Sequence, residues 1–231
     1  MQKGMYRHEY KYPINKMQMV LEEVKLSSIA FKDKNVGERG YYNIRSLYFD
    51  DYYNSCYMDN VNGTDNREKY RIRIYNHSTK SIKLEMKKKV RGKTQKLSCA
   101  ITEEQCRLLM EGIIPENIAL NQQVLHKLAY LMSTRFMKPV IIVDYDRIPY
   151  VYRTEDANVR VTFDMNLTSS DNISDFFEQR INGRGIFAVD ELLMEVKYDN
   201  FLPVEIDSLL QLEGLCASTF SKYFLCRRFK G

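Results

Sequence analysis

The stretch that decides the fold is EKYRIRIYN, residues 68–76, in which charged and apolar side chains alternate. Successive side chains of a β-strand point to opposite faces, so Lys69, Arg71 and Arg73 share one face of an extended segment. The tyrosine and isoleucines between them share the other face. A half-buried strand normally turns its charged face to water. The alternative is a row of cations that faces an enclosed space, which requires neighbouring strands to repeat the pattern.

The same alternation recurs along the chain. One face is shared by each of these sets: Arg7, Glu9 and Lys11; Lys83, Glu85, Lys87 and Lys89; Val143, Tyr145 and Arg147; Arg160, Thr162 and Asp164; Glu195 and Lys197. Each face taken alone is typical of a solvated strand. Adjacent rows of cations repel, however, and two like charges about 4 Å apart cost roughly 4 kcal/mol at an effective dielectric near 20. A sheet closed with these faces inward would enclose a basic lumen that a polyanion stabilises.

Hydrophobic periodicity predicts an α+β protein with a large antiparallel sheet or barrel. Strands are predicted at residues 6–12, 41–50, 55–61, 67–76, 81–90, 94–101, 139–152, 158–167 and 191–199. Helices are predicted at residues 14–25, 102–112 and 121–136, with one or two more within 202–215 and 218–229. Pro13 is expected to end the first strand and to open the helix that follows. With only 10 Gly and 5 Pro and no flexible linker, residues 1–231 are predicted to form one domain.

Composition narrows the function classes. The net charge of +5 is a mild positive excess, which suits an anionic partner. The five cysteines are odd in number and contain no CxxC pair, which argues against a disulfide framework or a zinc site. The start lacks an apolar signal region, and the longest aliphatic run, VIIV at 140–143, is too short to span a bilayer. The chain is therefore predicted to be cytoplasmic and not inserted in a membrane.

Eight short motifs occur in order and together resemble one family. They are RxExK at 7–11, SLYFDD at 46–51, RIR at 71–73, LExK at 84–87, YDR at 145–147, VR at 159–160, MEVK at 194–197 and SKY at 221–223. The series resembles the VTC domain, the polyphosphate polymerase module of vacuolar transporter chaperone complexes. That module belongs to the triphosphate tunnel metalloenzymes, along with the CYTH phosphohydrolases. The resemblance runs from about Tyr6 to about Phe229.

This resemblance implies an eight-stranded antiparallel β-barrel tunnel with a basic lumen and flanking helices. ATP would bind with its triphosphate in the tunnel together with Mn²⁺ or Mg²⁺, pass its γ-phosphoryl group to a growing inorganic polyphosphate chain and leave as ADP. By position, the residues implied to hold phosphates are Lys11, Arg71, Arg73, Lys87, Arg147 and Arg160, with Ser221 and Lys222 at one end. Glu195 is implied as the metal ligand and Tyr145 as a wall residue, with Lys197, Glu85 and Glu9 as further candidates.

Two departures from the family pattern affect the expected activity. CYTH hydrolases usually begin with ExExK, whereas Arg7 occupies the first glutamate position here. One acid fewer near the metal favours polymerase over hydrolase chemistry. The eukaryotic polymerases also carry an SPX domain and membrane spans, which this sequence does not contain. Regulation and translocation are therefore expected to come from separate proteins, including a membrane partner.

Two alternatives to the polymerase remain open at this point, and a third, nucleic-acid binding, is not expected. A tunnel hydrolase of tripolyphosphate or a nucleoside triphosphate shares the fold, with water in place of the phosphate acceptor. A non-enzymatic module that only binds polyphosphate is the second. The 17 tyrosines among basic strands could also stack on single-stranded nucleic acid. No RNP-like or KH-like signature is present, and acids such as Glu85 would repel a bare phosphate backbone, so no nucleic-acid partner is expected. Without the resemblance, Ser221 and Lys222 would be read as an ordinary helix surface.

Overall fold

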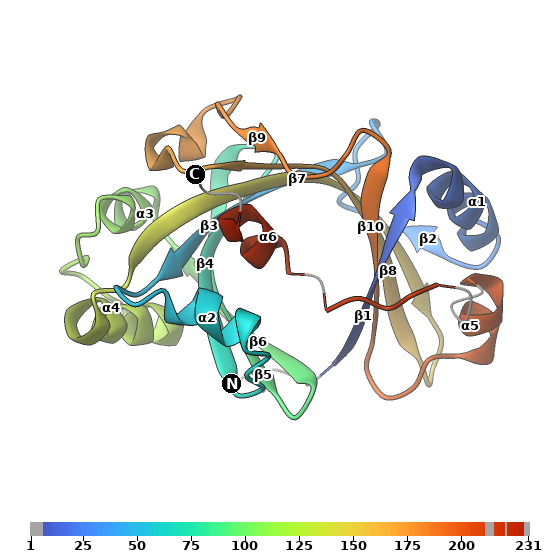
Figure 1. Cartoon of the computed structure of the whole chain (residues 1–231), viewed down its shortest axis with the longest axis horizontal. Helices are drawn as coiled ribbons and strands as arrows, with labels where there is room; N and C mark the ends of the chain where they lie inside the picture. Colours follow the sequence, from blue (N-terminus) through green and yellow to red (C-terminus); the bar gives the residue numbers. More distant parts are fainter. Residues whose placement is uncertain (1–6, 211–214, 220, 229–231) are drawn as a thin grey trace.

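A strongly curled antiparallel sheet forms the centre of the structure (Figure 1), a computed structural model that describes residues 7–210, 215–219 and 221–228. Its continuous path is β1 (His8–Asn15), β10 (Glu191–Tyr198), β8 (Asn158–Ser170), β7 (Lys138–Arg153), β3 (Tyr42–Asp50), β4 (Arg67–Tyr75), β5 (Ser78–Val90) and β6 (Lys93–Ile101). Two short strands lie off this path: β2 (Phe31–Lys32) pairs with β7, and β9 (Arg184–Gly185) pairs with β8. The predicted α+β fold built on eight long antiparallel strands is confirmed.

The two edges of the sheet meet along a narrow seam. Arg7, just before β1, and Thr94 on β6 exchange two backbone hydrogen bonds of 3.0 and 3.2 Å. Within the described residues this is the only pairing between the two edges. The curled sheet therefore encloses an interior. Continuous backbone hydrogen bonding joins its neighbouring strands everywhere except at this seam.

Helices cover the outer face of the sheet in two groups (Figure 1). On one side, α1 (Lys16–Leu26) and α5 (Val204–Leu210) pack beside β1 and β10 over an apolar cluster that includes Leu26, Val161, Met194 and Ile206. On the other, α3 (Glu103–Met110) and α4 (Gln123–Arg135) cover β5, β6 and β7 over a second cluster. None of the helices in the described part of the chain is long and apolar enough to cross a membrane.

The second apolar cluster settles the orientation of the stretch at 68–76. Ile72 and Ile74 are fully buried in it, together with Leu84 of the neighbouring strand. Because side chains alternate along a strand, the cations between these residues point to the concave side. There the short helix α6 (Lys222–Arg228) lies within the curl of the sheet, in contact with α2 (Ser55–Val61) (Figure 1). A 3₁₀ turn, η1 (Ile173–Phe177), packs on β3 and β7.

The strand predicted at residues 55–61 is wrong, because this segment forms α2. The reason lies just before it, in two acidic residues at the end of β3. The carboxylate of Asp50 accepts hydrogen bonds from the backbone N–H groups of Cys56 and Tyr57, and that of Asp51 accepts one from Ser55. These bonds satisfy the free donors of a helix N-terminus, which stabilises a helix in this segment.

The expectation for Pro13 is also wrong. This proline lies within β1 and pairs with Leu193, and the helix begins only at Lys16. A strand at the edge of a sheet tolerates proline because its missing N–H costs no ladder bond on the outer side. Asn15 then starts the helix through a capping box with Gln18. The predicted positions Tyr6, 211–214, Phe220 and 229 lie outside the described residues.

Candidate active site

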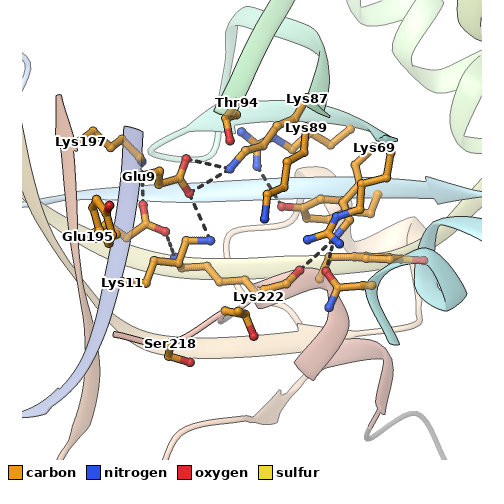
Figure 2. Close-up of a pocket in the computed structure, with 18 of the residues that line it drawn as sticks. Glu9, Lys11, Lys69, Lys87, Lys89, Thr94, Glu195, Lys197, Ser218 and Lys222 are labelled. Carbon is orange, nitrogen blue, oxygen red and sulfur yellow. Dashed lines mark hydrogen bonds and ion pairs between the residues drawn. The ribbon is translucent and has the colours of Figure 1, made fainter. Parts of the chain in front are cut away.

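The concave face of the sheet lines a cavity of about 360 Å³ (Figure 2). Ten cationic side chains line it, namely Lys11, Arg67, Lys69, Arg71, Arg73, Lys87, Lys89, Arg147, Lys197 and Lys222. The two carboxylates among the described lining residues are those of Glu9 and Glu195, which belong to neighbouring strands. The cavity is therefore strongly basic, with its acids on one side.

Most of the predicted site residues meet in this cavity. Those that line it are Glu9, Lys11, Arg71, Arg73, Lys87, Tyr145, Arg147, Glu195, Lys197, Ser221 and Lys222. Arg160 and Glu85 do not. Arg160 contacts the Tyr42 hydroxyl and the Asp33 carboxylate, each at 2.9 Å. Glu85 is fully buried in the wall, where it forms ion pairs with Arg71 at 2.8 Å and Arg73 at 3.6 Å.

One end of the cavity pairs each cation with an acid; we call it the acid-paired end and define it by Arg147, Asp164, Glu195, Lys197 and Lys222. Lys222 Nζ lies 2.5 Å from Asp164 and 2.9 Å from Glu195. Arg147 contacts Asp164 at 2.6 Å and Glu195 at 3.2 Å, and Lys197 contacts Glu195 at 2.7 Å. The backbone register places these groups together, because Arg147 pairs with Asp164 across β7 and β8.

These pairings decide the charge states at the acid-paired end. Burial would raise the pKa of Glu195, but Lys197, Lys222 and Arg147 hold it well below its usual range. Burial would likewise lower the pKa of Lys222, yet Asp164 and Glu195 raise it above the ordinary lysine value. The carboxylate and the ammonium are thus both ionised at neutral pH.

The cations of the other end are not ion-paired, although the carboxylate of Asp65 acts on Arg67 and Lys89 from farther away; we call it the acid-free end and define it by Arg67, Lys69 and Lys89. In the described part of the chain, none of the three lies within ion-pair distance of a carboxylate. Lys69 Nζ instead contacts Asn60 Oδ1 at 2.9 Å and Ser221 Oγ at 3.0 Å. Burial, with the nearby charges of Arg67 and Lys87, lowers the pKa of Lys69 to about 7.

Lys87 lies between the two ends and shares features of both. Its ammonium contacts both oxygens of Glu9 at 2.9 Å. Its pKa is nonetheless lowered to about 7, since burial and the charges of Lys11 and Lys197 outweigh this one partner. Figure 2 shows the two carboxylates, Glu9 and Glu195, on one side of the cavity and Lys69 on the other.

The sequence-based assignment missed several lining residues. Lys69 and Lys89 lie on charged faces that the sequence pattern identifies but were not assigned to the site, and Arg67 continues the row of β4 with the same period of two. Asn60 comes from the segment misread as a strand, and Ser218 from the segment before α6. These two reach the cavity only through the tertiary fold, and no local pattern marks them.

Glu9 and Glu195 are the residues that could hold a divalent cation. No group of three His, Cys, Asp or Glu side chains able to bind a metal is found among the described residues. Mg²⁺ in nucleotide sites commonly binds one or two carboxylates and completes its shell with waters and substrate phosphates. Glu195 Oε1 accepts a hydrogen bond from Lys222, and a carboxylate oxygen has two lone pairs. Two carboxylates therefore fit a divalent ion whose remaining ligands are phosphate oxygens and waters.

Comparison with known proteins identifies the family. Residues 6–229 match the model of the VTC domain. The chain belongs to the VTC domain family. No curated protein matches the sequence. Among solved structures, a candidate adenylate cyclase from Bacillus halodurans has a TM-score of 0.56 at 13% identity over all of both chains. A candidate adenylyl cyclase from Hippeastrum, with a dominant triphosphatase activity, has a TM-score of 0.54 at 14% identity, over 98% of this chain and 97% of that one. At such identities the likeness shows the fold alone.

In this VTC domain, motifs far apart in the sequence meet at the cavity. Arg71 and Arg73 come from β4, Arg147 from β7, Glu195 from β10 and Lys222 from the start of α6. Both arginines of β4 are held from behind by Glu85, and Arg147 is held by Asp164. Guanidinium groups fixed in this way keep further N–H donors for an oxyanion, a geometry that suits phosphate.

Proposed function

We propose that this VTC domain is a polyphosphate polymerase. It binds ATP in the cavity, transfers the γ-phosphoryl group to the end of an inorganic polyphosphate chain and releases ADP. The observation that carries the proposal is the composition of the cavity wall, with ten cations against two carboxylates around about 360 Å³. A ligand with several adjacent phosphates complements such a wall better than a compact monoanion does.

The roles of the residues follow from their surroundings. Phosphoryl transfer depends mainly on positioning and on stabilisation of charge, which fixed cations supply. Arg71, Arg73 and Arg147 are braced by buried carboxylates, so they would orient the phosphates with little loss of side-chain freedom. Lys11 and Lys87 both contact Glu9 and would supply point charge from the adjacent wall.

A divalent cation, Mn²⁺ or Mg²⁺, would be held by Glu195 with Glu9 as a further ligand. When bound, the ion would neutralise negative charge on the phosphate oxygens of the substrate. Glu195 would orient it from the acid-paired end, where Lys197, Lys222 and Arg147 keep the carboxylate ionised. The acid-free end, where no carboxylate of the described residues lines the cavity, suits a metal-free stretch of the polyphosphate chain.

A separate membrane protein is proposed as the partner that would translocate the product, with the chain acting on the cytoplasmic side. This part of the proposal rests on the family resemblance. Purification of the chain from its own cells under mild detergent, followed by identification of what comes with it, would test it. Recovery of the chain without any integral membrane protein would count against such a partner.

The test of the activity is incubation of the purified chain with ATP and Mn²⁺. Products are resolved on a gel stained for polyphosphate, while ADP and free phosphate are assayed in parallel. A ladder of polymer together with ADP is expected. Free phosphate without polymer would instead indicate a hydrolase, the second candidate, which the triphosphatase activity of the Hippeastrum protein of the same fold favours. If neither polymer nor free phosphate forms but the chain binds tripolyphosphate, the chain is a binding module without this activity. Arg153→Ala, a change at an exposed position at the end of β7 and outside the cavity lining, serves as a control variant and should be as active as the wild type.

A further inference from the structure

The carboxylate of Asp50 joins three elements at a fully buried point. It accepts backbone hydrogen bonds from Asp51 at 2.9 Å, Cys56 at 2.8 Å and Tyr57 at 3.1 Å. It also accepts the hydroxyl proton of Tyr223 in α6. Asp50 is fully buried and Tyr223 only 1% exposed. A buried carboxyl group with this many donors is a rigid anchor, since removing any donor leaves a buried acceptor unsatisfied.

Neighbouring side chains at the start of α6 reach different strands of the curled sheet. Lys222 extends to Asp164 on β8 and Glu195 on β10. Tyr223, the next residue, extends to Asp50 at the end of β3. The first turn of α6 therefore contacts both halves of the curled sheet, through Lys222 on one side and Tyr223 on the other.

Tyr223 also contacts the groups that shape the rest of the cavity. Its ring lies 5.0 Å from that of Tyr48, centroid to centroid, and the Tyr48 hydroxyl accepts a 2.9 Å hydrogen bond from Arg71. Lys69 Nζ lies 5.3 Å from the centre of the Tyr223 ring. Although Tyr223 lines the cavity, its hydroxyl is directed to Asp50 and is not available to a ligand.

We propose that Tyr223 and Asp50 are positioning residues. Their hydrogen bond fixes the first turn of α6 and thereby holds the Lys222 ammonium between Asp164 and Glu195. Neither group needs to touch a substrate for this role. The alternative is that the bond is one of many packing contacts of α6, which also stacks Phe224 on Tyr57 with ring centroids 5.2 Å apart. The two readings differ in what happens to Lys222 when the bond is removed.

The first test measures the accessibility of Lys222 and requires no ligand. Wild type, Tyr223→Phe and the matched control Tyr150→Phe are treated with acetic anhydride, and acetylation of Lys222 is followed by mass spectrometry. Tyr150 also donates a hydrogen bond to a carboxylate, that of Glu23 at 3.0 Å, but in the other half of the molecule. Lys16, whose side chain is 59% exposed, serves as the internal reference.

Acetylation of Lys222 is expected to rise about tenfold or more in Tyr223→Phe, the change that one lost hydrogen bond to a charged group produces in an opening equilibrium. It should stay at the wild-type rate in Tyr150→Phe. Asp50→Asn provides a second variant, which keeps an acceptor oxygen and should give a smaller rise. If Lys222 reacts at the wild-type rate in both folded variants, or if only one variant folds and shows no rise, the proposal is wrong.

The second test, a thermodynamic cycle on tripolyphosphate affinity, rests on the proposed function. Calorimetry compares wild type, Tyr223→Phe, Lys222→Met and the double variant. Tyr223→Phe should weaken binding about tenfold in the wild-type background and not further in the Lys222→Met background, because contacting residues couple. Additive losses would overturn a role exerted through Lys222. If the wild type does not bind tripolyphosphate, the proposed function fails, and the labelling result still decides the positioning role.

Discussion

Lys222 and Lys69 line the same cavity, yet their surroundings shift their pKa values in opposite directions. Lys222 has two carboxylates at 2.5 and 2.9 Å. Lys69 has an amide oxygen and a hydroxyl as partners, with other cations nearby. Burial disfavours the charged form of both, so the difference comes from the partners. The acid-paired end is neutralised by the protein itself, whereas the acid-free end is left for a ligand to neutralise.

The largest expected effect is on turnover, and it should differ between the two buried acids of the acid-paired end, Glu195 and Asp164. Glu195→Gln should lower metal-dependent turnover at least about 100-fold, because it removes a carboxylate that lines the cavity. Asp164→Asn is the matched change, since Asp164 contacts the same Lys222 and Arg147 but does not line the cavity. It should affect stability more than turnover. Rates of ADP release and melting temperatures of both variants measure this. Equal losses of turnover would mean that Glu195 acts only as a charge partner.

The two lysines provide a matched pair for stability. Lys222→Met should destabilise the unliganded protein by about 3 kcal/mol, because Asp164 and Glu195 lose a buried partner. Lys69→Met removes the same charge and the same length of side chain from the acid-free end, where it should leave the stability unchanged or raise it. Urea unfolding of both variants gives the two values. A loss in Lys69→Met as large as that in Lys222→Met would remove the distinction between the ends.

The pH dependence should follow the lysines with lowered pKa values. Lys69 and Lys87 have pKa values of about 7 in the folded protein, whereas an unfolded lysine binds its proton up to about pH 10.4. Between these values the unfolded chain binds more protons, so the stability of the unliganded protein should rise as pH rises from 7 to 10. Below pH 7 both lysines are charged in either state and the destabilisation is fully present.

Tripolyphosphate affinity should change in the opposite sense. Loss of these protons should weaken binding about tenfold between pH 6 and pH 9, roughly the contribution of one charge-assisted hydrogen bond. Lys69→Met should remove part of this dependence, and Lys222→Met should leave its shape unchanged because the pKa of Lys222 is raised. Calorimetry across this range measures both slopes. An unchanged slope in Lys69→Met would show that another group titrates.

The smallest effect concerns the metal alone. With two cavity carboxylates already paired to cations, Mn²⁺ without phosphate should bind weakly and shift the melting temperature by less than about 1 °C. Tripolyphosphate at about 100 times its dissociation constant adds about 2.7 kcal/mol and should give a clear upward shift. Mn²⁺ should then increase that shift further. Thermal melts with each ligand alone and both together measure this, and a large shift with Mn²⁺ alone would indicate additional metal ligands.

The sequence predicted the sheet well because the alternation within a strand is a local property. The inward cation rows, including Arg71 and Arg73, follow directly from it. The neutralisation of those rows could not be predicted, since it depends on register between strands: Glu85 lies opposite Arg71. It also depends on α6, which brings Lys222 to Asp164 from a distant part of the chain. The error at residues 55–61 has the same origin, because the carboxylate of Asp50, at the end of the preceding strand, bonds the backbone of Cys56 and Tyr57 and stabilises a helix there.

The narrow seam has a consequence for how the proposed polyphosphate product would leave the cavity. A polymer inside a barrel whose strands are hydrogen-bonded on all sides can leave only through one of the two open ends. Here the wall is joined along one line by the two hydrogen bonds of Arg7 and Thr94, with the ion pair of Glu9 and Lys87 beside it. An anion that takes Lys87 competes with Glu9 for the same ammonium. If the proposed polyphosphate occupies the cavity, its binding would therefore weaken a contact that helps to hold the two edges of the sheet together.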